Sequence, residues 1–278
     1  MIRIITDSTS DISQQKGADM GIDIIPLLVH FGEEAYRDGI DISNEEFYKK
    51  LQEADTLPTT SQLNPFDLEA VFKKYISKGD DVIGIFISSE LSGTYQSAVI
   101  AKNSLDSDHI FLIDSKNVTF GLALLIEEAV IMRDQGKTAE EIAGKIEELK
   151  SRVRLYAAVD TLKYLKMGGR ISSSTAIIGS VLGINPIVSI EHGKVESVGK
   201  VRGRKAAFRW LLEKMKEDAP DFDYSFFFGH TNAPEVLSDC IEFITPHVDS
   251  KNVKSNDIGV IVGTHAGPGA VGIAYIAK

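Results

Sequence analysis

The stretch from Asp81 to Leu105 constrains the fold most strongly, because its chemistry changes abruptly halfway along. It opens with an unbroken apolar run, Val82 to Ile87, which is typical of a β-strand buried on both faces. Hydroxyl residues and a glycine follow, and from Tyr95 apolar residues recur at helical spacing. The free backbone N–H groups at such a helix start suit an anion. We therefore predict an anion site, with Ser92 as the helix N-cap and Gly93 giving a ligand access to the backbone, although an ordinary cap is the alternative.

Short apolar runs alternate with helical patterns along the first half of the chain. This alternation predicts an α/β fold with a mostly parallel sheet flanked by helices, and such sheets bind ligands at the carboxyl ends of their strands. The second half is richer in strand-like runs and has a hairpin signal at 192–194. It predicts an α+β domain with a largely antiparallel sheet. We expect an N-terminal domain over residues 1–152 and a C-terminal domain over residues 153–278.

Local patterns add finer expectations. The turn at Asp7 and Ser8 is expected near the Ser92 turn, at the same edge of the sheet. Residues 11–16 are expected to form a short helix ended by a glycine, and residues 259–262 a strand. The polar segments are expected to be loops, over residues 33–41 and 56–62.

Composition excludes several classes of protein. The chain has 278 residues and a net charge of −10, which argues against a general nucleic-acid binder. A single cysteine, Cys240, and an N-terminus without a signal-peptide pattern indicate a cytoplasmic protein. The run from Ile171 to Ile190 has no charge and the length of a bilayer span. Its five serines, with glycine and proline, favour a buried helix followed by a strand.

The cofactor motifs in the chain are weak. Gly267 to Gly272 matches the spelling of the dinucleotide fingerprint, but about six residues remain after it, too few for a helix and a second strand. Histidines and cysteines do not have metal-ligand spacing, so we expect neither a metal nor a cofactor. His265 follows an apolar run within a glycine-rich turn, where it is either a ligand contact or a structural residue.

Six segments taken together resemble the DegV family, which includes the fatty-acid-binding subunits of bacterial fatty-acid kinase. They run from end to end of the chain, so the resemblance covers all of it. The segments are ITDSTSDI from residue 5, TSQ from residue 60, SSELSGTYQSA from residue 88, LKYLKMGGRIS from residue 162, GKVRGRKAA from residue 199 and GTHAGPGAVGI from residue 263.

The resemblance implies two domains with a long-chain fatty acid buried between them. The carboxylate would be held by residues that match the family's hydroxyl, glycine and histidine positions: Thr60, Ser61, Ser92, Gly93, Thr94 and His265. A carboxylate that leaves water needs several hydrogen bonds, which hydroxyls and helix N–H groups supply. Neutral donors would also keep the carboxylate reactive. The acyl tunnel is expected along the uncharged run, at Ile177, Ile178, Val181, Leu182 and Ile184.

The resemblance further implies a carrier without catalytic residues of its own. It would present the acid to a separate ATP-using kinase subunit, which makes acyl-phosphate for phospholipid synthesis. Arg170 and Arg202 would contact that partner or the phosphate, and transient contact with a membrane surface is expected.

Two other functions stay open. A hydrolase or phosphotransferase could use Ser92 with His265, and Asp7 or Asp114 could orient the histidine, although no nucleophile motif is present. A binder of another small anion, such as a nucleotide or sugar phosphate, would leave the apolar wall without a role.

Overall fold

The computed structural model describes residues 1–171, 183–249 and 251–278. Its first layer is a four-stranded parallel sheet in the order β2-β1-β6-β7, which confirms the parallel sheet predicted for the first half. The strands are β1 (Ile2–Asp7), β2 (Ile22–Ile25), β6 (Asp81–Phe86) and β7 (Ile110–Asp114).

Helices cover both faces of this sheet. Helices α3 (Pro65–Ile76) and α4 (Thr94–Leu105) pack on one face, and α5 (Thr119–Asp134) and α6 (Ala139–Leu149) pack on the other. The predicted caps form locally, since Asn64 accepts a hydrogen bond from the N–H of Phe66 and Thr138 forms a capping box with Glu141.

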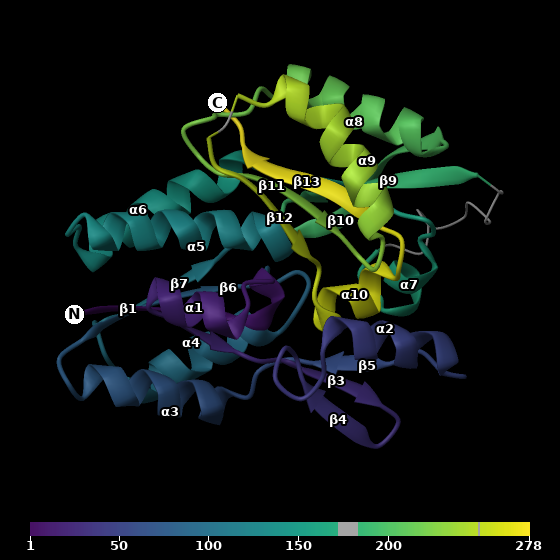
Figure 1. Cartoon of the computed structure of the whole chain (residues 1–278). Helices are drawn as coiled ribbons and strands as arrows, with labels where there is room; N and C mark the ends of the chain where they lie inside the picture. Colours follow the sequence, from purple (N-terminus) through teal and green to yellow (C-terminus); the bar gives the residue numbers. More distant parts are fainter. Residues whose placement is uncertain (172–182, 250) are drawn as a thin grey trace.

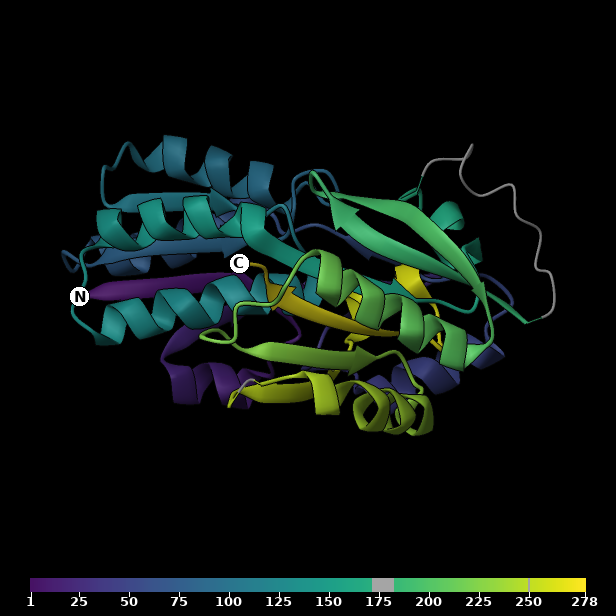
Figure 2. The same cartoon turned by 90° about the horizontal axis from the view of Figure 1, so that it is seen from above.

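The second half builds a six-stranded sheet in the order β10-β9-β8-β13-β11-β12. Within it, β11 and β12 pair in parallel, and the other described neighbours are antiparallel, as predicted. The strands are β8 (Val153–Ala158), β9 (Ile184–Glu191), β10 (Lys194–Arg202), β11 (Phe226–His230), β12 (Val253–Asp257) and β13 (Val271–Ile276). Helices α8 (Arg204–Glu217) and α9 (Pro234–Ile244) cover one face, and α5 lies between the two sheets (Figure 1). From above, the β9–β10 hairpin forms one edge of this sheet (Figure 2).

Two polar segments predicted as loops contain strands. β4 (Glu34–Arg37) and β5 (Thr59–Ser61) flank β3 (Leu28–Phe31) in a small antiparallel sheet, which lies beside α2 (Asn44–Glu53). The prediction was wrong because these strands are short and partly exposed, so their side chains lack an apolar alternation.

One helix prediction and one strand prediction were also wrong. Helix α1 runs over Gln14–Met20 and ends at Gly21, in a left-handed conformation, whereas Gly17 lies inside it. A Cβ atom on Gly17 would lie 2.5 Å from a side-chain carbon of Ile24, so this glycine serves close packing against β2. The predicted strand at residues 259–262 is the start of helix α10 (Val260–Ala266), because a short apolar run fits either structure and tertiary packing decides.

The core joins the two halves of the chain. One cluster of buried side chains combines Ile4 and Leu122 with Ala274 and Ile276, and Val260 of α10 packs in a second cluster with Phe47 of α2. The predicted division at residues 152 and 153 falls where β8 begins, and it stays a prediction. None of the helices in the described ranges has the length and apolar character that crossing a bilayer requires.

Candidate functional site

A cavity of about 170 Å³ lies between the two halves, lined by segments that follow β2, β6 and β7. Its lining combines hydrogen-bonding side chains with apolar ones. The lining side chains come from both halves: Leu27, Thr60, Ser61, Gln62, Ile87, Leu91, Ser92, Val118, Leu165, Arg170, Val195, Ile261, Val262, His265 and Ala266, with Gly93.

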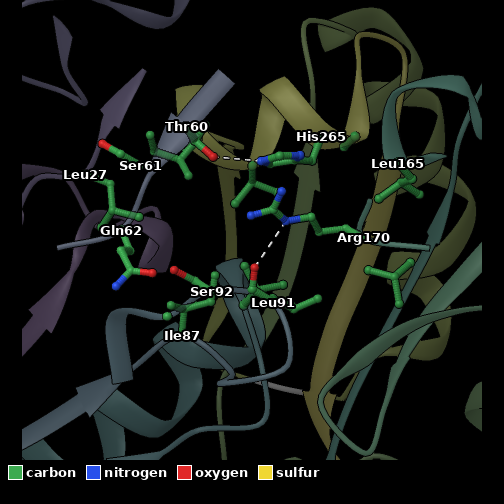
Figure 3. A pocket seen from close by; sticks show the side chains of 16 residues that line it. Leu27, Thr60, Ser61, Gln62, Ile87, Leu91, Ser92, Leu165, Arg170 and His265 are labelled. Atoms are coloured by element: carbon green, nitrogen blue, oxygen red, sulfur yellow. Dashed lines mark hydrogen bonds between the residues drawn. The ribbon is translucent and has the colours of Figure 1, made fainter. Parts of the chain in front are cut away.

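Thr60 and His265 meet across this cavity (Figure 3). The Thr60 hydroxyl and the Nε2 atom of His265 lie 2.9 Å apart and form a hydrogen bond between β5 and α10. The Nδ1 atom of His265 is buried and has no hydrogen-bond partner among the described residues. Burial lowers the pKa of His265 to about 4, and the positive charge of Arg170 acts in the same direction. The imidazole is therefore neutral at physiological pH and offers hydrogen bonds rather than charge.

His265 was predicted in a turn after a strand, and it lies instead in the last turn of α10. The backbone of Gly168 forms the surface against its ring, since a Cβ atom there would lie 2.2 Å from Nδ1. This glycine follows α7 (Lys163–Met167), whose Tyr164 ring packs in the same way against Gly267. Two glycines thus let α7 and α10 approach closely around the imidazole.

Ser92 and Gly93 stand at the start of α4, but their roles differ from the prediction. Gly93 is the N-cap residue and makes no side-chain cap. The Ser92 hydroxyl accepts a hydrogen bond from the N–H of Thr94 at 3.3 Å and lies 3.0 Å from the Thr94 hydroxyl. The helix begins one residue later than predicted because Thr94 turns inward and accepts a hydrogen bond from the N–H of Leu63. Gly93 lies close to Gln62, where a Cβ atom would collide with the amide.

Arg170 brings a positive charge into the cavity. Its guanidinium is held by two backbone carbonyls, those of Leu91 at 3.2 Å and Gly168 at 2.5 Å, and lies in the space between His265 and Ser92 (Figure 3). Burial lowers its pKa, and no carboxylate of the described residues forms an ion pair with it. The expectation that only neutral donors surround the head group therefore misses this cation. A half-buried guanidinium without a counter-ion favours an anion beside it.

The other predicted residues lie in varied places. Ser61 lines the cavity, but its hydroxyl pairs with Nε2 of His30 at 3.1 Å. Thr94 is buried behind Ser92 and Arg202 is exposed at the end of β10, in a separate depression with Arg204 and Lys205. Ile184 begins β9 and is partly exposed. The other predicted tunnel residues, Ile177, Ile178, Val181 and Leu182, lie outside the described residues.

Several lining residues were not predicted. The apolar wall includes Leu27, Val118 and Val195, which lie in three separate segments of the chain. Each lies in a run whose periodicity predicts only that the residue is buried. The local sequence does not show whether a buried side chain lines a cavity or packs in a filled core.

The arrangement expected of a Ser–His hydrolase is not formed. His265 pairs with Thr60, and Ser92 pairs with Thr94. The carboxylates proposed to orient the histidine are engaged elsewhere, because Asp7 accepts from the N–H of Ile87 and Asp114 from the hydroxyl of Ser89. Within the described part of the chain, no three acidic, histidine or cysteine side chains gather as metal ligands do.

The contact between Gly168 and His265 yields a first prediction. Gly168→Ala should displace the imidazole and admit water, which raises the pKa of His265 from about 4 towards its ordinary value of 6.5. An NMR titration of the His265 ring measures this pKa. Gly144→Ala is the matched control, because a Cβ atom on that helical glycine meets nothing within 4 Å. An unchanged titration in Gly168→Ala would contradict the packing described here.

Comparison with known proteins places the chain among relatives of the same length. A DegV domain-containing protein of Caldanaerobacter subterraneus subsp. tengcongensis is 38% identical over 278 residues, which cover 100% of this chain and 99% of the relative. Two solved structures share the fold. A fatty-acid-binding DegV family protein from Thermus thermophilus matches with a TM-score of 0.91 at 27% identity, covering 100% of this chain and 99% of that one.

The second structure is DegV, a fatty acid binding protein from Bacillus subtilis. It matches with a TM-score of 0.87 at 33% identity and covers 100% of this chain and 99% of that one. The family model described as an uncharacterised protein of the DegV family matches residues 1–278. The chain therefore belongs to the DegV family.

Proposed function

We propose that the protein binds a long-chain fatty acid in the cavity and presents its carboxylate to a separate ATP-using kinase. The observation that carries this proposal is the half-buried guanidinium of Arg170, which lacks a carboxylate partner among the described residues and faces a cavity that has both hydrogen-bonding and apolar side chains in its lining. An anionic head with an apolar body satisfies both features. The fatty acids bound by the relatives from Thermus thermophilus and Bacillus subtilis support the same ligand class.

The head group lies among donors from both halves of the chain. Arg170 supplies the charge, and the hydroxyls of Thr60 and Ser92 and the neutral ring of His265 supply hydrogen bonds. Hydrogen bonds to an ionised carboxylate are stronger than neutral ones, and they offset the cost of removing it from water. The buried Nδ1 atom of His265, which has no partner in the described structure, gives the ring further hydrogen-bonding capacity.

The apolar walls account for the acyl chain. Leu27, Ile87, Val118 and Ile261 face the cavity from different elements. Each methylene removed from water contributes about 0.8 kcal/mol, so a long acyl chain gains on the order of 10 kcal/mol before association costs are subtracted. A sugar phosphate gains nothing from these walls and a nucleotide gains only through its base, whereas a fatty acid uses them along its whole chain, which favours the fatty acid over another small anion.

The proposed reaction takes place on the partner kinase. A carboxylate oxygen of the bound acid attacks the γ-phosphorus of ATP, the bond from that phosphorus to the bridging oxygen of ADP breaks, and acyl-phosphate and ADP leave. The protein itself has no phosphate-loop sequence and would supply only the positioned acid. Arg202 is exposed beside Lys205 at the end of β10, and we assign this basic surface to an acidic face of the kinase.

The role of Arg170 is tested with matched ligands. Arg170→Gln should weaken the binding of a C16 or C18 fatty acid by about tenfold or more, because one charge-assisted contact is lost. Binding of the long-chain alcohol of equal length should change little. Isothermal titration calorimetry measures both affinities, and Lys166→Gln, an exposed neighbour, is the control. Equal losses for acid and alcohol would contradict a head-group role.

The assignment of Arg202 predicts a separation of two activities. Arg202→Glu should leave fatty-acid affinity unchanged, because the side chain lies outside the cavity, and should lower the rate of acyl-phosphate formation by the kinase at least tenfold. Lys137→Glu, a charge reversal at an exposed site between α5 and α6, is the control. A normal rate with Arg202→Glu would place the docking surface elsewhere.

A further inference from the structure

The short segment from Asp7 to Asp11, here called the Asp7–Asp11 loop, connects β1 with α1 and takes no part in the proposed head-group contacts. It contains one 3₁₀ turn, Ser8–Ser10, and its hydroxyl side chains are buried. Removing the carboxylates of Asp7 and Asp11 from water costs free energy. Their hydrogen bonds lead in each case to a segment that forms the cavity.

Asp7 and Ser8 fix two walls of the cavity in this way. The Asp7 carboxylate accepts a hydrogen bond from the N–H of Ile87 at 2.8 Å, and Ile87 lines the cavity at the start of the segment that carries Ser92. The Ser8 hydroxyl accepts a hydrogen bond from the N–H of Leu27 at 3.1 Å, and Leu27 lines the cavity as well.

Asp11 reaches the third wall, which belongs to the other half of the chain. Its Oδ1 atom accepts a hydrogen bond from the N–H of Gly259 at 2.9 Å. Gly259 is the N-cap residue of α10, and α10 presents Ile261 and His265 to the cavity. The approach is close, because a Cβ atom on Gly259 would lie 2.8 Å from the Asp11 carboxylate.

We propose that the Asp7–Asp11 loop is the positioning element of the ligand site, and that Asp11 is the positioning residue for His265. Residues of this one loop form hydrogen bonds both to the segment that carries Ser92 and to helix α10, which carries His265. The proposal rests on the proposed function only in naming the fatty acid as the ligand whose affinity this support controls.

The conformation of Asp11 supports this assignment. Its φ angle is +54°, in the left-handed region, which is unfavourable for a residue with a side chain and suits Gly or Asn better. Among the described residues its Oδ2 atom is buried without a hydrogen bond of ordinary geometry. Burial raises the pKa of Asp11 well above the ordinary value, and the nearby hydroxyl of Thr119 acts in the opposite direction. The carboxylate of Asp38 lies at the same helix start, where the N–H groups of Val260 and Ile261 interact with it, so Asp38 supports α10 beside Asp11. Local stability alone does not account for an aspartate here, whereas the hydrogen bond to Gly259 does.

The decisive variant is Asp11→Gly, which removes the carboxylate and also relieves the left-handed backbone. Three quantities are measured: the unfolding temperature, the NMR titration of His265 in the ligand-free protein, and the affinity for a C16 or C18 fatty acid. We expect a variant that remains folded, a pKa of His265 shifted towards 6.5, and an affinity about tenfold lower.

Two further variants separate positioning from general destabilisation. Asp11→Asn keeps the oxygen that accepts from Gly259 and tolerates the left-handed backbone, so it should retain the wild-type titration and affinity. Asp106→Gly is the matched control, because Asp106 is also a left-handed aspartate, with φ of +44°, but it is exposed at the end of α4. It should match the wild type in the titration of His265 and in the affinity for the fatty acid.

The proposal is overturned if folded Asp11→Gly keeps both the wild-type titration of His265 and the wild-type affinity. It is also overturned if Asp11→Asn loses as much as Asp11→Gly, since the accepting oxygen would then be irrelevant. If the wild type binds no fatty acid, the proposed function fails. The titration of His265 in the ligand-free variants still decides whether Asp11 positions α10.

Discussion

The hydrogen bond between Thr60 and His265 joins side chains 205 positions apart, and the ligand site depends on this meeting. Thr60 lies on the small three-stranded sheet, and His265 lies on a helix from the last twenty residues of the chain. The parallel sheet cannot bring them together alone, because it contains neither residue. They meet because α10 packs against β3 and β5, and two glycines let α7 close in from the other side. The second half of the fold thus completes a cavity that the first half begins at its strand ends.

Burial gives the site its electrostatic character. A dry environment keeps His265 neutral and leaves Arg170 as the charge that faces the cavity. Two backbone carbonyls hold the guanidinium but do not neutralise it. The charge of Arg170 favours an anionic ligand, and the apolar side chains of the lining favour a ligand with an apolar part. In the proposed complex the acyl chain would supply most of the affinity, and the carboxylate would set the orientation of the ligand.

Local sequence predicted those parts of the site that depend on a single segment. The turn at Ser92 and Gly93 follows from one strand, one turn and one helix, and its position was predicted to within a residue. His265, predicted as a candidate ligand contact, lines the cavity, but the helix that carries it was not predicted, because a short apolar run fits a strand equally well. The direction of the Arg170 side chain depends on the glycine turn before it and on contact with Leu91, a residue 79 positions away. No local pattern encodes such a contact, and the scattered apolar wall of the cavity was missed for the same reason.

Mass spectrometry shows directly whether the cavity holds a long-chain fatty acid. The protein is purified without added lipid and denatured, and its organic extract is analysed with the protein concentration measured in parallel. We expect about one long-chain fatty acid per protein chain, and a lower occupancy in Arg170→Gln prepared in the same way. The proposed fatty-acid binding would be contradicted if the extract contained no fatty acid and the folded protein also failed to bind added fatty acid.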